Sequence, residues 1–300
     1  ANDYLVKPTN TEELGKRVRT ILDNAKSSHT SKDLPQTSYV GHDDETIVEG
    51  LSPVQATGEL TVVVGSRGGV GTTTTAINVA FALAAEQEPA VLVDLDQTQG
   101  HISLYLNHKV TTGLNNLAEV DANYIRGEMA DKYMAYDERL TLLLTKPNLY
   151  NQRPVLTGHH TVGLADALMY TGQKVIVDAG CGVSEVNQPL IEKATRVIVC
   201  VQPERISVSA AKQLISKLKR LMVPDAQLWV LMLDFTQGVQ LPRKAVESFI
   251  GHKLYTVVSI AQQDMVQAVN SGKPLVTVRP KSDAAAVFRK LAAQIAVKQN

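Results

Sequence analysis

A glycine-rich segment between a short apolar run and a helix-like segment carries the clearest chemical signal in this sequence. Residues 62–74 read Val-Val-Val-Gly-Ser-Arg-Gly-Gly-Val-Gly-Thr-Thr-Thr, and the helix-like segment continues to residue 85. The glycines allow backbone N–H groups to close around an anion, and the N-terminus of the helix adds partial positive charge. The spacing therefore predicts a phosphate-binding loop that joins a strand to a helix.

One position in this loop departs from the usual pattern. Loops of this kind place a lysine before a Ser/Thr residue, whereas this chain has Thr72 before Thr73. Loss of one charge-assisted phosphate contact costs about 1.5–3 kcal/mol, which is about 10- to 150-fold in affinity. A cation aimed at the transferring phosphoryl group can contribute about 10³–10⁵ in rate. We therefore expect binding of a nucleotide to survive in part, and hydrolysis to be weak or absent.

Carboxylates follow two other apolar runs. One run ends at Asp94 and Asp96, whose side chains point to the same face at strand spacing, and another ends at Asp178, before the glycines of residues 179–182. Such carboxylates can bind Mg²⁺, partly through water, or orient an attacking water. Taken alone, Asp94 and Asp96 fit a solvated strand end equally well. Three strand ends that meet at one phosphate site favour the nucleotide interpretation.

The elements that must position these residues alternate along the chain. Strands are expected at residues 60–65, 90–95, 140–145, 174–179, 196–202, 228–233 and 254–260. Helices are expected at residues 73–86, 160–171, 185–194, 207–221, 242–251, 262–271 and 283–297. Alternation of apolar strands with amphipathic helices predicts an α/β fold, with a mostly parallel twisted sheet flanked by helices on both faces. Ligands then bind beyond the carboxyl ends of the strands.

The loop and the strand ends resemble those of the MinD/ParA ATPases. Residues 67–73 are similar to the deviant Walker A pattern KGGxGK[ST], and the aspartate loop and residues 178–182 follow in that superfamily's order. Residues 199–204 and 267–275 also look like theirs. Within the superfamily, the chain resembles the TadZ/CpaE proteins of tight-adherence (Flp, type IV-like) pilus assembly, including at residues 100–106.

This resemblance implies a set of site residues for ATP or ADP with Mg²⁺. Those implied in nucleotide binding are Arg67, Gly68, Gly69, Val70, Gly71, Thr72, Thr73, Thr74, Gly182 and Asp234. Those implied at Mg²⁺, partly through water, are Thr73, Asp94 and Asp178. Asp96 would position the attacking water if the protein is active. Gly182 would sense the γ-phosphate, and Asp234 stands where relatives often carry an asparagine that reads adenine, which leaves the base preference open.

Arg67 stands at the position of the superfamily's signature lysine, which reaches the partner's phosphates across a homodimer. Arginine keeps that charge and can bind phosphate through two N–H groups, so the resemblance implies that the role across the dimer is retained.

Three regions are expected along the chain. Residues 1–23 resemble the last strand and helix of a two-component receiver domain, with Lys7 before the proline; the alternative is an unrelated amphipathic arm. Residues 24–58 are polar and contain prolines, which is typical of a linker. Residues 59–300 are expected to form the nucleotide-binding domain.

The composition favours a soluble globular protein. Lys+Arg and Asp+Glu number 30 each, so the chain has no net field that would attract nucleic acid or a membrane. It has no apolar stretch of the about 18–20 residues that span a membrane, and no visible signal peptide, so we expect a cytoplasmic location. Cys181 and Cys200 follow or lie in apolar runs and are both expected to be buried and reduced.

Three further features favour ordinary structural roles. His159 and His160 are expected as a surface pair at a helix start, because no second group of ligands has metal spacing. The basic residues of the helix at 207–221 are expected to form a solvated face, although partitioning relatives use such a patch for DNA. The helix at 283–297 is expected to pack on the core, in preference to binding a membrane.

These observations predict a nucleotide-binding, dimerising factor, at most a weak Mg²⁺-dependent ATPase. The resemblance implies that it helps to localise or assemble a tight-adherence pilus with other pilus assembly proteins, at a cell pole or the inner face of the membrane, which it would contact only indirectly. Nucleic acid is not expected as a partner. The alternatives are an active ParA-like partitioning ATPase that binds DNA, and a scaffold with a vestigial loop that binds no nucleotide.

Overall fold

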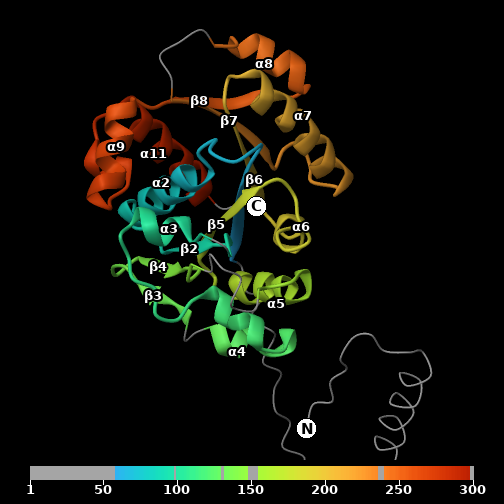
Figure 1. The fold of residues 1–300 in the computed structure, drawn as a ribbon, viewed down its shortest axis with the longest axis vertical. Helices are drawn as coiled ribbons and strands as arrows, with labels where there is room; N and C mark the ends of the chain where they lie inside the picture. The colour runs from blue at the N-terminus through green and yellow to red at the C-terminus, as the bar shows by residue number, and fades with distance from the viewer. Residues whose placement is uncertain (1–57, 98, 130–131, 148–154, 236–239, 298–300) are drawn as a thin grey trace, which may run out of the picture. The chain divides into compact units, whose positions relative to one another are not determined.

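A computed structural model describes residues 58–97, 99–129, 132–147, 155–235 and 240–297 (Figure 1). The predicted receiver-like remnant at residues 1–23 lies outside the described residues, as does the predicted linker up to residue 57. The domain boundaries stay a prediction.

The described part of the chain is built on an eight-stranded sheet. The strand order is β3-β4-β2-β5-β1-β6-β7-β8, and all neighbours are parallel except β3 and β4. In sequence order the strands are Glu59–Gly65 (β1), Ala90–Asp94 (β2), Met134–Ala135 (β3), Leu140–Leu143 (β4), Lys174–Cys181 (β5), Arg196–Val201 (β6), Leu228–Asp234 (β7) and Leu254–Ser259 (β8). All seven predicted strands are present, and the fold-class prediction is confirmed. The two-residue β3 was not predicted, because so short a strand leaves no pattern.

Helices cover both faces of this sheet (Figure 1). The seven predicted helices correspond to Thr72–Ala85 (α2), Gly158–Met169 (α5), Gln188–Glu192 (α6), Arg205–Arg220 (α7), Arg243–Ile250 (α8), Gln262–Ser271 (α9) and Asp283–Ala296 (α11). The short helices His101–Tyr105 (α3), Leu114–Glu119 (η1), Ala122–Tyr124 (η2), Ile125–Met129 (α4) and Leu275–Val278 (α10) were not predicted. Each of these has six residues or fewer, which is too short to show a helical repeat of apolar positions.

Alternate residues of β1 belong to the two different cores. Val62 and Val64 belong to one core with residues of α5, α6 and α7, whereas Val63 belongs to the other with α2 and α11. Both cores exclude solvent, which explains why the central strands read as continuous apolar runs. Phe288 of α11 is fully buried in the second core, so the prediction that the C-terminal helix packs on the core is confirmed.

Helix α6 is shorter than the predicted 185–194. Ser184 and Asn187 form reciprocal hydrogen bonds, with Ser184 N–H donating to Asn187 Oδ1 at 2.8 Å and Asn187 N–H to Ser184 Oγ at 3.3 Å. This turn occupies the first residues of the predicted helix, and α6 itself begins at Gln188, with Pro189 in its first turn. Side-chain hydrogen bonds of this kind compete with helical ones.

A buried ionic group lies where β1, β5 and β6 begin. Glu59 contacts Lys174 Nζ at 2.9 Å and Arg196 Nη1 at 3.1 Å, and the Arg196 side chain is only 2% exposed. Arg196 Nη2 also donates to the Gln294 carbonyl at 3.4 Å, at the end of α11. This group ties the C-terminal helix to the edge of the sheet opposite the phosphate loop.

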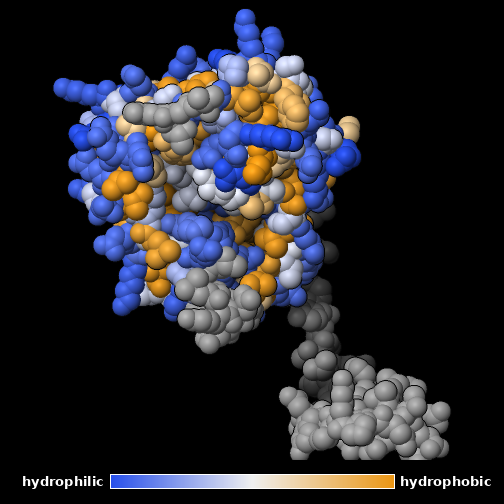
Figure 2. All heavy atoms as spheres, turned by 45° about the horizontal axis from the view of Figure 1, so that its top comes forward, coloured by the Kyte–Doolittle hydropathy of each residue, from blue (hydrophilic) through white to orange (hydrophobic). Residues whose placement is uncertain are grey.

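The described surface is mixed in polarity. Figure 2 shows hydrophobic atoms at several places among a largely hydrophilic face, and Leu104 and Ile206 are exposed by 64% and 69%. Across the described residues, no helix combines the length and apolarity that crossing a bilayer requires.

Candidate functional site

The predicted phosphate loop joins β1 to α2 at the carboxyl edge of the sheet. Gly69 and Gly71 have φ of 78° and 96°, a region that side chains other than glycine rarely adopt. A Cβ at Gly71 would lie 2.7 Å from Leu233 Cδ2 and 2.8 Å from Phe235 Cζ, so any other residue would strain the backbone and displace these side chains. The first N–H groups of α2 have no acceptor within the helix. The loop therefore has the backbone of an anion cradle.

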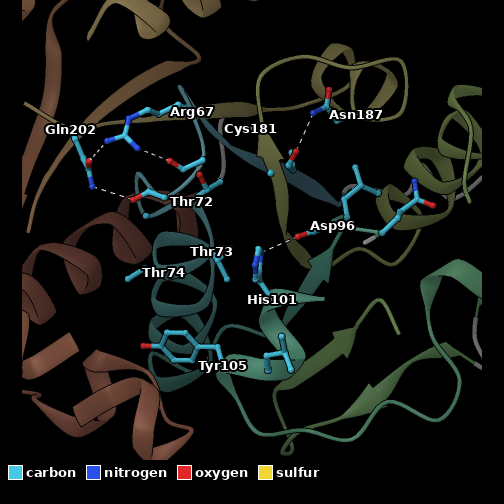
Figure 3. A pocket seen from close by; sticks show the side chains of 18 of the residues that line it. Arg67, Thr72, Thr73, Thr74, Asp96, His101, Tyr105, Cys181, Asn187 and Gln202 are labelled. Atoms are coloured by element: carbon cyan, nitrogen blue, oxygen red, sulfur yellow. Dashed lines mark hydrogen bonds and ion pairs between the residues drawn. The ribbon is translucent and has the colours of Figure 1, made fainter. Parts of the chain in front are cut away.

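Arg67 is held against its own chain. Its Nε donates to Glu204 Oε1 at 2.9 Å, its Nη2 to Gln202 Oε1 at 2.7 Å and its Nη1 to the Gly68 carbonyl at 2.7 Å. Gln202 Nε2 in turn donates to the Gly69 carbonyl at 3.1 Å (Figure 3). These bonds brace the loop, so Arg67 must release them before its guanidinium can reach a second subunit.

Glu204 joins this brace to the start of α7. Its Oε1 accepts the Ser207 N–H at 2.8 Å as the helix N-cap, and Ser207 Oγ lies 2.8 Å from Ser66 Oγ. Desolvation acts to raise the pKa of Glu204, but the hydrogen bonds from Arg67 and from the Ser207 N–H outweigh it and hold that pKa below its usual value. The phosphate loop and α7 are thus joined through charged and neutral hydrogen bonds.

Thr72 occupies the place of the loop lysine with a short side chain. It is 8% exposed, and its Oγ1 would lie 2.4 Å from a Cβ added at Gly65, so the hydroxyl is turned under the loop. No ammonium group is supplied from this position. Thr72 and Thr74 line a cavity beside the loop, which is described below. Val70 is fully buried in the core, so only its backbone could contact a phosphate.

Thr73 and Asp178 form the pair expected at a magnesium ion. Thr73 Oγ1 donates to Asp178 Oδ2 at 2.6 Å, and Asp178 Oδ1 accepts the Gly180 N–H at 3.2 Å. Burial raises the pKa of Asp178, while the Thr73 hydrogen bond acts in the opposite direction. Hydroxyl and carboxylate oxygens suit Mg²⁺, and its charge would offset the cost of the buried carboxylate.

Asp94 accepts hydrogen bonds from two backbone N–H groups. Its carboxylate is fully buried and accepts the Asp96 N–H at 3.0 Å and the Ile102 N–H at 3.1 Å. Burial, reinforced by Asp178, raises the pKa of Asp94 well above its usual range. These bonds support the turn between β2 and α3, and the role of Asp94 at Mg²⁺ stays a prediction, as do those of Thr73 and Asp178.

Asp96 lines the cavity and is paired with a residue that the sequence did not single out. His101 Nδ1 lies 2.9 Å from Asp96 Oδ2, and the Gln99 N–H donates to Asp96 Oδ1 at 3.3 Å. Figure 3 shows His101 between Thr73 and Asp96. A histidine so soon after the aspartate loop was the available signal, but its position depends on the unpredicted helix α3.

The segment after β5 differs in two ways from expectation. The Gly182 N–H already donates to the Gly65 carbonyl at 3.0 Å, so contact with a γ-phosphate would require that bond to be exchanged. The prediction that both cysteines are buried is wrong for Cys181, which is exposed and lines the cavity, because the strand leaves the core at Gly180. Asn187 Nδ2 donates to the Ala179 carbonyl at 3.1 Å, which links the start of α6 back to the end of β5.

Arg67, the loop glycines, residues 72–74, Asp96 and His101 line one cavity of about 980 Å³, whereas Asp178 and Gly182 are not in its lining. Its polar side is formed by the loop, the Asp96–His101 pair and the segment after β5. Its apolar side is lined by Leu104, Tyr105, Phe235, Met265 and Val269. Asp234 lies instead at a neighbouring cavity of about 1020 Å³, and Phe235 lines both. The arrangement suits an elongated ligand with an anionic end and an apolar end.

Metal binding by protein side chains alone has no basis in the part of the chain that the structure describes. No group of three or more His, Cys, Asp or Glu residues there is placed to hold an ion. A magnesium ion at Thr73 and Asp178 would need further oxygen ligands from phosphate and water, which is how Mg²⁺ is usually bound beside nucleotides.

The histidine pair and the basic face of α7, two of the three features expected to have ordinary structural roles, are also visible. Thr157 Oγ1 lies 2.8 Å from His160 Nδ1 at the start of α5, which confirms the surface pair of histidines. The basic side chains of α7 are exposed as predicted; Lys217 Nζ donates to the Val183 carbonyl at 2.9 Å, and Lys219 pairs with Asp225 at 3.1 Å.

Comparison with known proteins identifies relatives over most of the described residues. A family model described as an AAA domain matches residues 58–227. The chain is 28% identical over 237 residues to the chromosome-partitioning ATPase Soj of Thermus thermophilus, across 76% of this chain and 92% of Soj. A ParA family ATPase from Chlorobium tepidum TLS shares the fold with a TM-score of 0.71 at 19% identity, across 79% of this chain and 98% of that chain. The septum site-determining protein MinD of Pyrococcus horikoshii OT3, solved with Mg-ADP, shares the fold with a TM-score of 0.64 at 19% identity. The match covers 80% of this chain and 96% of that chain.

Proposed function

Because this chain belongs to the AAA-domain family, and to the MinD/ParA superfamily of P-loop ATPases, we propose that it binds ATP with Mg²⁺, dimerises, and hydrolyses ATP weakly or not at all. The cavity supports this proposal because its lining combines a glycine cradle suited to phosphates, Thr73 bonded to Asp178 as at a metal, and apolar side chains that could contact a base.

Each part of the loop has a separate task in this proposal. Gly68, Gly69 and Gly71 let backbone N–H groups approach the phosphates without a Cβ in the way. Thr73 and Asp178 would hold Mg²⁺, which when bound neutralises phosphate charge. Asp96 lies where it could position water, but its carboxylate already accepts from His101.

The observation that carries the proposal is Thr72 at the lysine position. Its hydroxyl is turned toward Gly65 and carries no charge to place on a phosphoryl group. Backbone cradling is a ground-state interaction and survives this change. Stabilisation of the charge that develops during phosphoryl transfer does not, because it depends on the missing cation.

We also propose that this module localises or assembles a tight-adherence pilus together with other pilus assembly proteins. Support comes from residues 100–106 and from the order of a receiver-like segment, a linker and this ATPase domain, in which the chain resembles TadZ/CpaE proteins. Recruitment to a cell pole or to the inner face of the membrane belongs to this part of the proposal.

Calorimetry with Mg-ATP and a phosphate-release assay test the nucleotide part directly. Thr72→Lys should tighten Mg-ATP binding by about 10- to 150-fold and raise turnover by more than it raises affinity. Thr72→Ser keeps a small hydroxyl and is the matched control, expected to behave like the wild type. If Thr72→Lys changes neither affinity nor rate, our account of the loop is wrong.

Similarity to Soj favours one other candidate, an active partitioning ATPase that binds DNA. It requires the wild type to hydrolyse Mg-ATP readily and to bind duplex DNA only with nucleotide. The absence of any Mg-nucleotide binding by the wild type would instead indicate a scaffold with a vestigial loop.

A further inference from the structure

His101 has a position in the cavity that none of the roles above uses. It begins α3, its side chain is 48% exposed, and its Nδ1 lies 2.9 Å from Asp96 Oδ2. Figure 3 shows the ring beside Thr73, on the side of the cavity where the predicted metal pair lies. With Nδ1 engaged by a carboxylate, Nε2 is the ring nitrogen that can contact a ligand.

The cavity has few sources of positive charge. Among the described residues that line it, only Arg67 and His101 have side chains that can be positively charged. Arg67 is committed to Glu204, Gln202 and a backbone carbonyl of its own loop. His101 contacts Asp96 through Nδ1. It can therefore contact an anion without breaking the hydrogen bonds that Arg67 makes to its own chain.

The carboxylates of this site make such a cation necessary. Asp96 lines the cavity, Asp178 lies beneath Thr73, and Asp94 is buried behind both. Of these, Asp96 in the turn after β2 and Asp178 of β5 interact electrostatically with His101. A terminal phosphate placed among them is repelled unless Mg²⁺ and a protein cation offset their charge.

We propose that His101, oriented by Asp96, supplies to the terminal phosphate of a bound nucleoside triphosphate the cationic contact that Thr72 does not. This inference rests on the proposed function and extends it. Asp96 accepts a hydrogen bond from Nδ1–H, and Nε2–H of the imidazolium donates a hydrogen bond to the phosphate oxygen. No bond other than a hydrogen bond forms. The pair thereby distinguishes a triphosphate from a diphosphate, because only the triphosphate extends to it.

Calorimetry with Mg-ATP and Mg-ADP tests the assignment. His101→Gln keeps a polar side chain but cannot become a cation, and should weaken Mg-ATP by about 3- to 10-fold, the effect of a charge-assisted contact reduced by solvent exposure. Mg-ADP affinity should change by less than about 2-fold. His159→Gln, an exposed histidine on α5 away from the cavity, is the matched control and should leave both affinities unchanged.

A double-mutant cycle with Thr72→Lys completes the test. If lysine and His101 serve the same phosphate, the effect of His101→Gln should shrink in the Thr72→Lys background. Equal losses for Mg-ATP and Mg-ADP, or wild-type behaviour of His101→Gln, would each overturn the assignment to His101 while leaving nucleotide binding intact. If the wild type binds neither nucleotide, the proposed function and this inference fail together.

Discussion

The two thiols lie in opposite environments, although both follow apolar runs. Cys200 is fully buried in β6, with its Sγ 3.5 Å from Thr75 Oγ1, and burial raises the pKa of its thiol to about 12. Cys181 is exposed at the end of β5 and lines the cavity. Reactivity follows the thiolate and its access, so only Cys181 should react with a maleimide in the folded protein.

Labelling of Cys181 therefore reports occupancy of the cavity. The native protein should take up one maleimide, and Cys181→Ser should take up none until it is unfolded. Saturating Mg-ATP should slow the reaction in proportion to the bound fraction, by up to about 100-fold at 100 times the dissociation constant. Intact-mass spectrometry over time measures the rate. Rapid labelling of Cys200, or no protection by nucleotide at concentrations that calorimetry shows to be saturating, would contradict this assignment.

Helix α7 is the element that connects the two loops of the site. Glu204 joins its first turn to Arg67, and Lys217, three turns later, donates to the Val183 carbonyl in the segment that precedes α6. Its buried side faces the core through Val208 and Leu218, and its other side is exposed and basic. A change in the position of either loop therefore alters contacts of the same helix.

Removal of the Glu204 carboxylate should weaken this connection measurably. Glu204→Ala loses both the N-cap and the ion pair, and should lower the free energy of unfolding by about 0.5–1.5 kcal/mol, as for other N-caps. Glu204→Gln is the control that keeps an acceptor for the Ser207 N–H. Urea denaturation measures both. Equal stability of Glu204→Ala and the wild type would mean that the brace contributes nothing.

The same carboxylate predicts a pH dependence. Its pKa in the folded protein lies below the ordinary value of 4.5, so the folded state binds the proton less readily than the unfolded chain. The contribution of Glu204 is therefore present in full above that ordinary value and is lost as pH falls through the folded pKa. The stability difference between the wild type and Glu204→Gln should be constant near neutrality and disappear in acid.

On the scale of the whole molecule, the proposed dimer depends on release of Arg67. The guanidinium is 36% exposed but holds three acceptors of its own chain. If Arg67 crosses to a partner's phosphates, binding of that partner must outweigh these bonds. The cavity edge also exposes Leu104, which a second subunit could cover.

Light scattering after size-exclusion chromatography tests this arrangement. The wild type should be a monomer without nucleotide and a dimer with saturating Mg-ATP. Arg67→Ala should remain a monomer, with dimerisation weakened by about tenfold or more because a charge-assisted contact is lost. Glu204→Gln loosens the brace but keeps Arg67, and should dimerise at least as readily as the wild type. Dimerisation of Arg67→Ala at the wild-type concentration would exclude the role of Arg67 across the interface.

Local patterns were sufficient for much of this molecule. The continuous apolar runs of β1, β5 and β6 indicated strands buried on both faces, and the glycines around Val70 indicated the loop between β1 and α2. Strand ends of a parallel sheet meet at one edge, so the meeting of Thr73 with Asp178 followed from the order of the elements alone. The spacing of apolar residues and the positions of glycines involve only a few neighbouring residues, so they can be recognised in the sequence without knowledge of the fold.

The contacts between distant segments were decided only by the tertiary structure. Asp94 and Asp96 share one strand-end pattern, yet Asp94 is buried under the turn and Asp96 faces the cavity, because α3 folds back over one of them. Arg67 and Glu204 stand 137 positions apart, and the pairing of His101 with Asp96 depends on a helix of five residues. The sequence by itself determined that Thr72 brings no charge to the phosphate loop. Which cation lies near enough to replace it depends on packing between segments that no local pattern records.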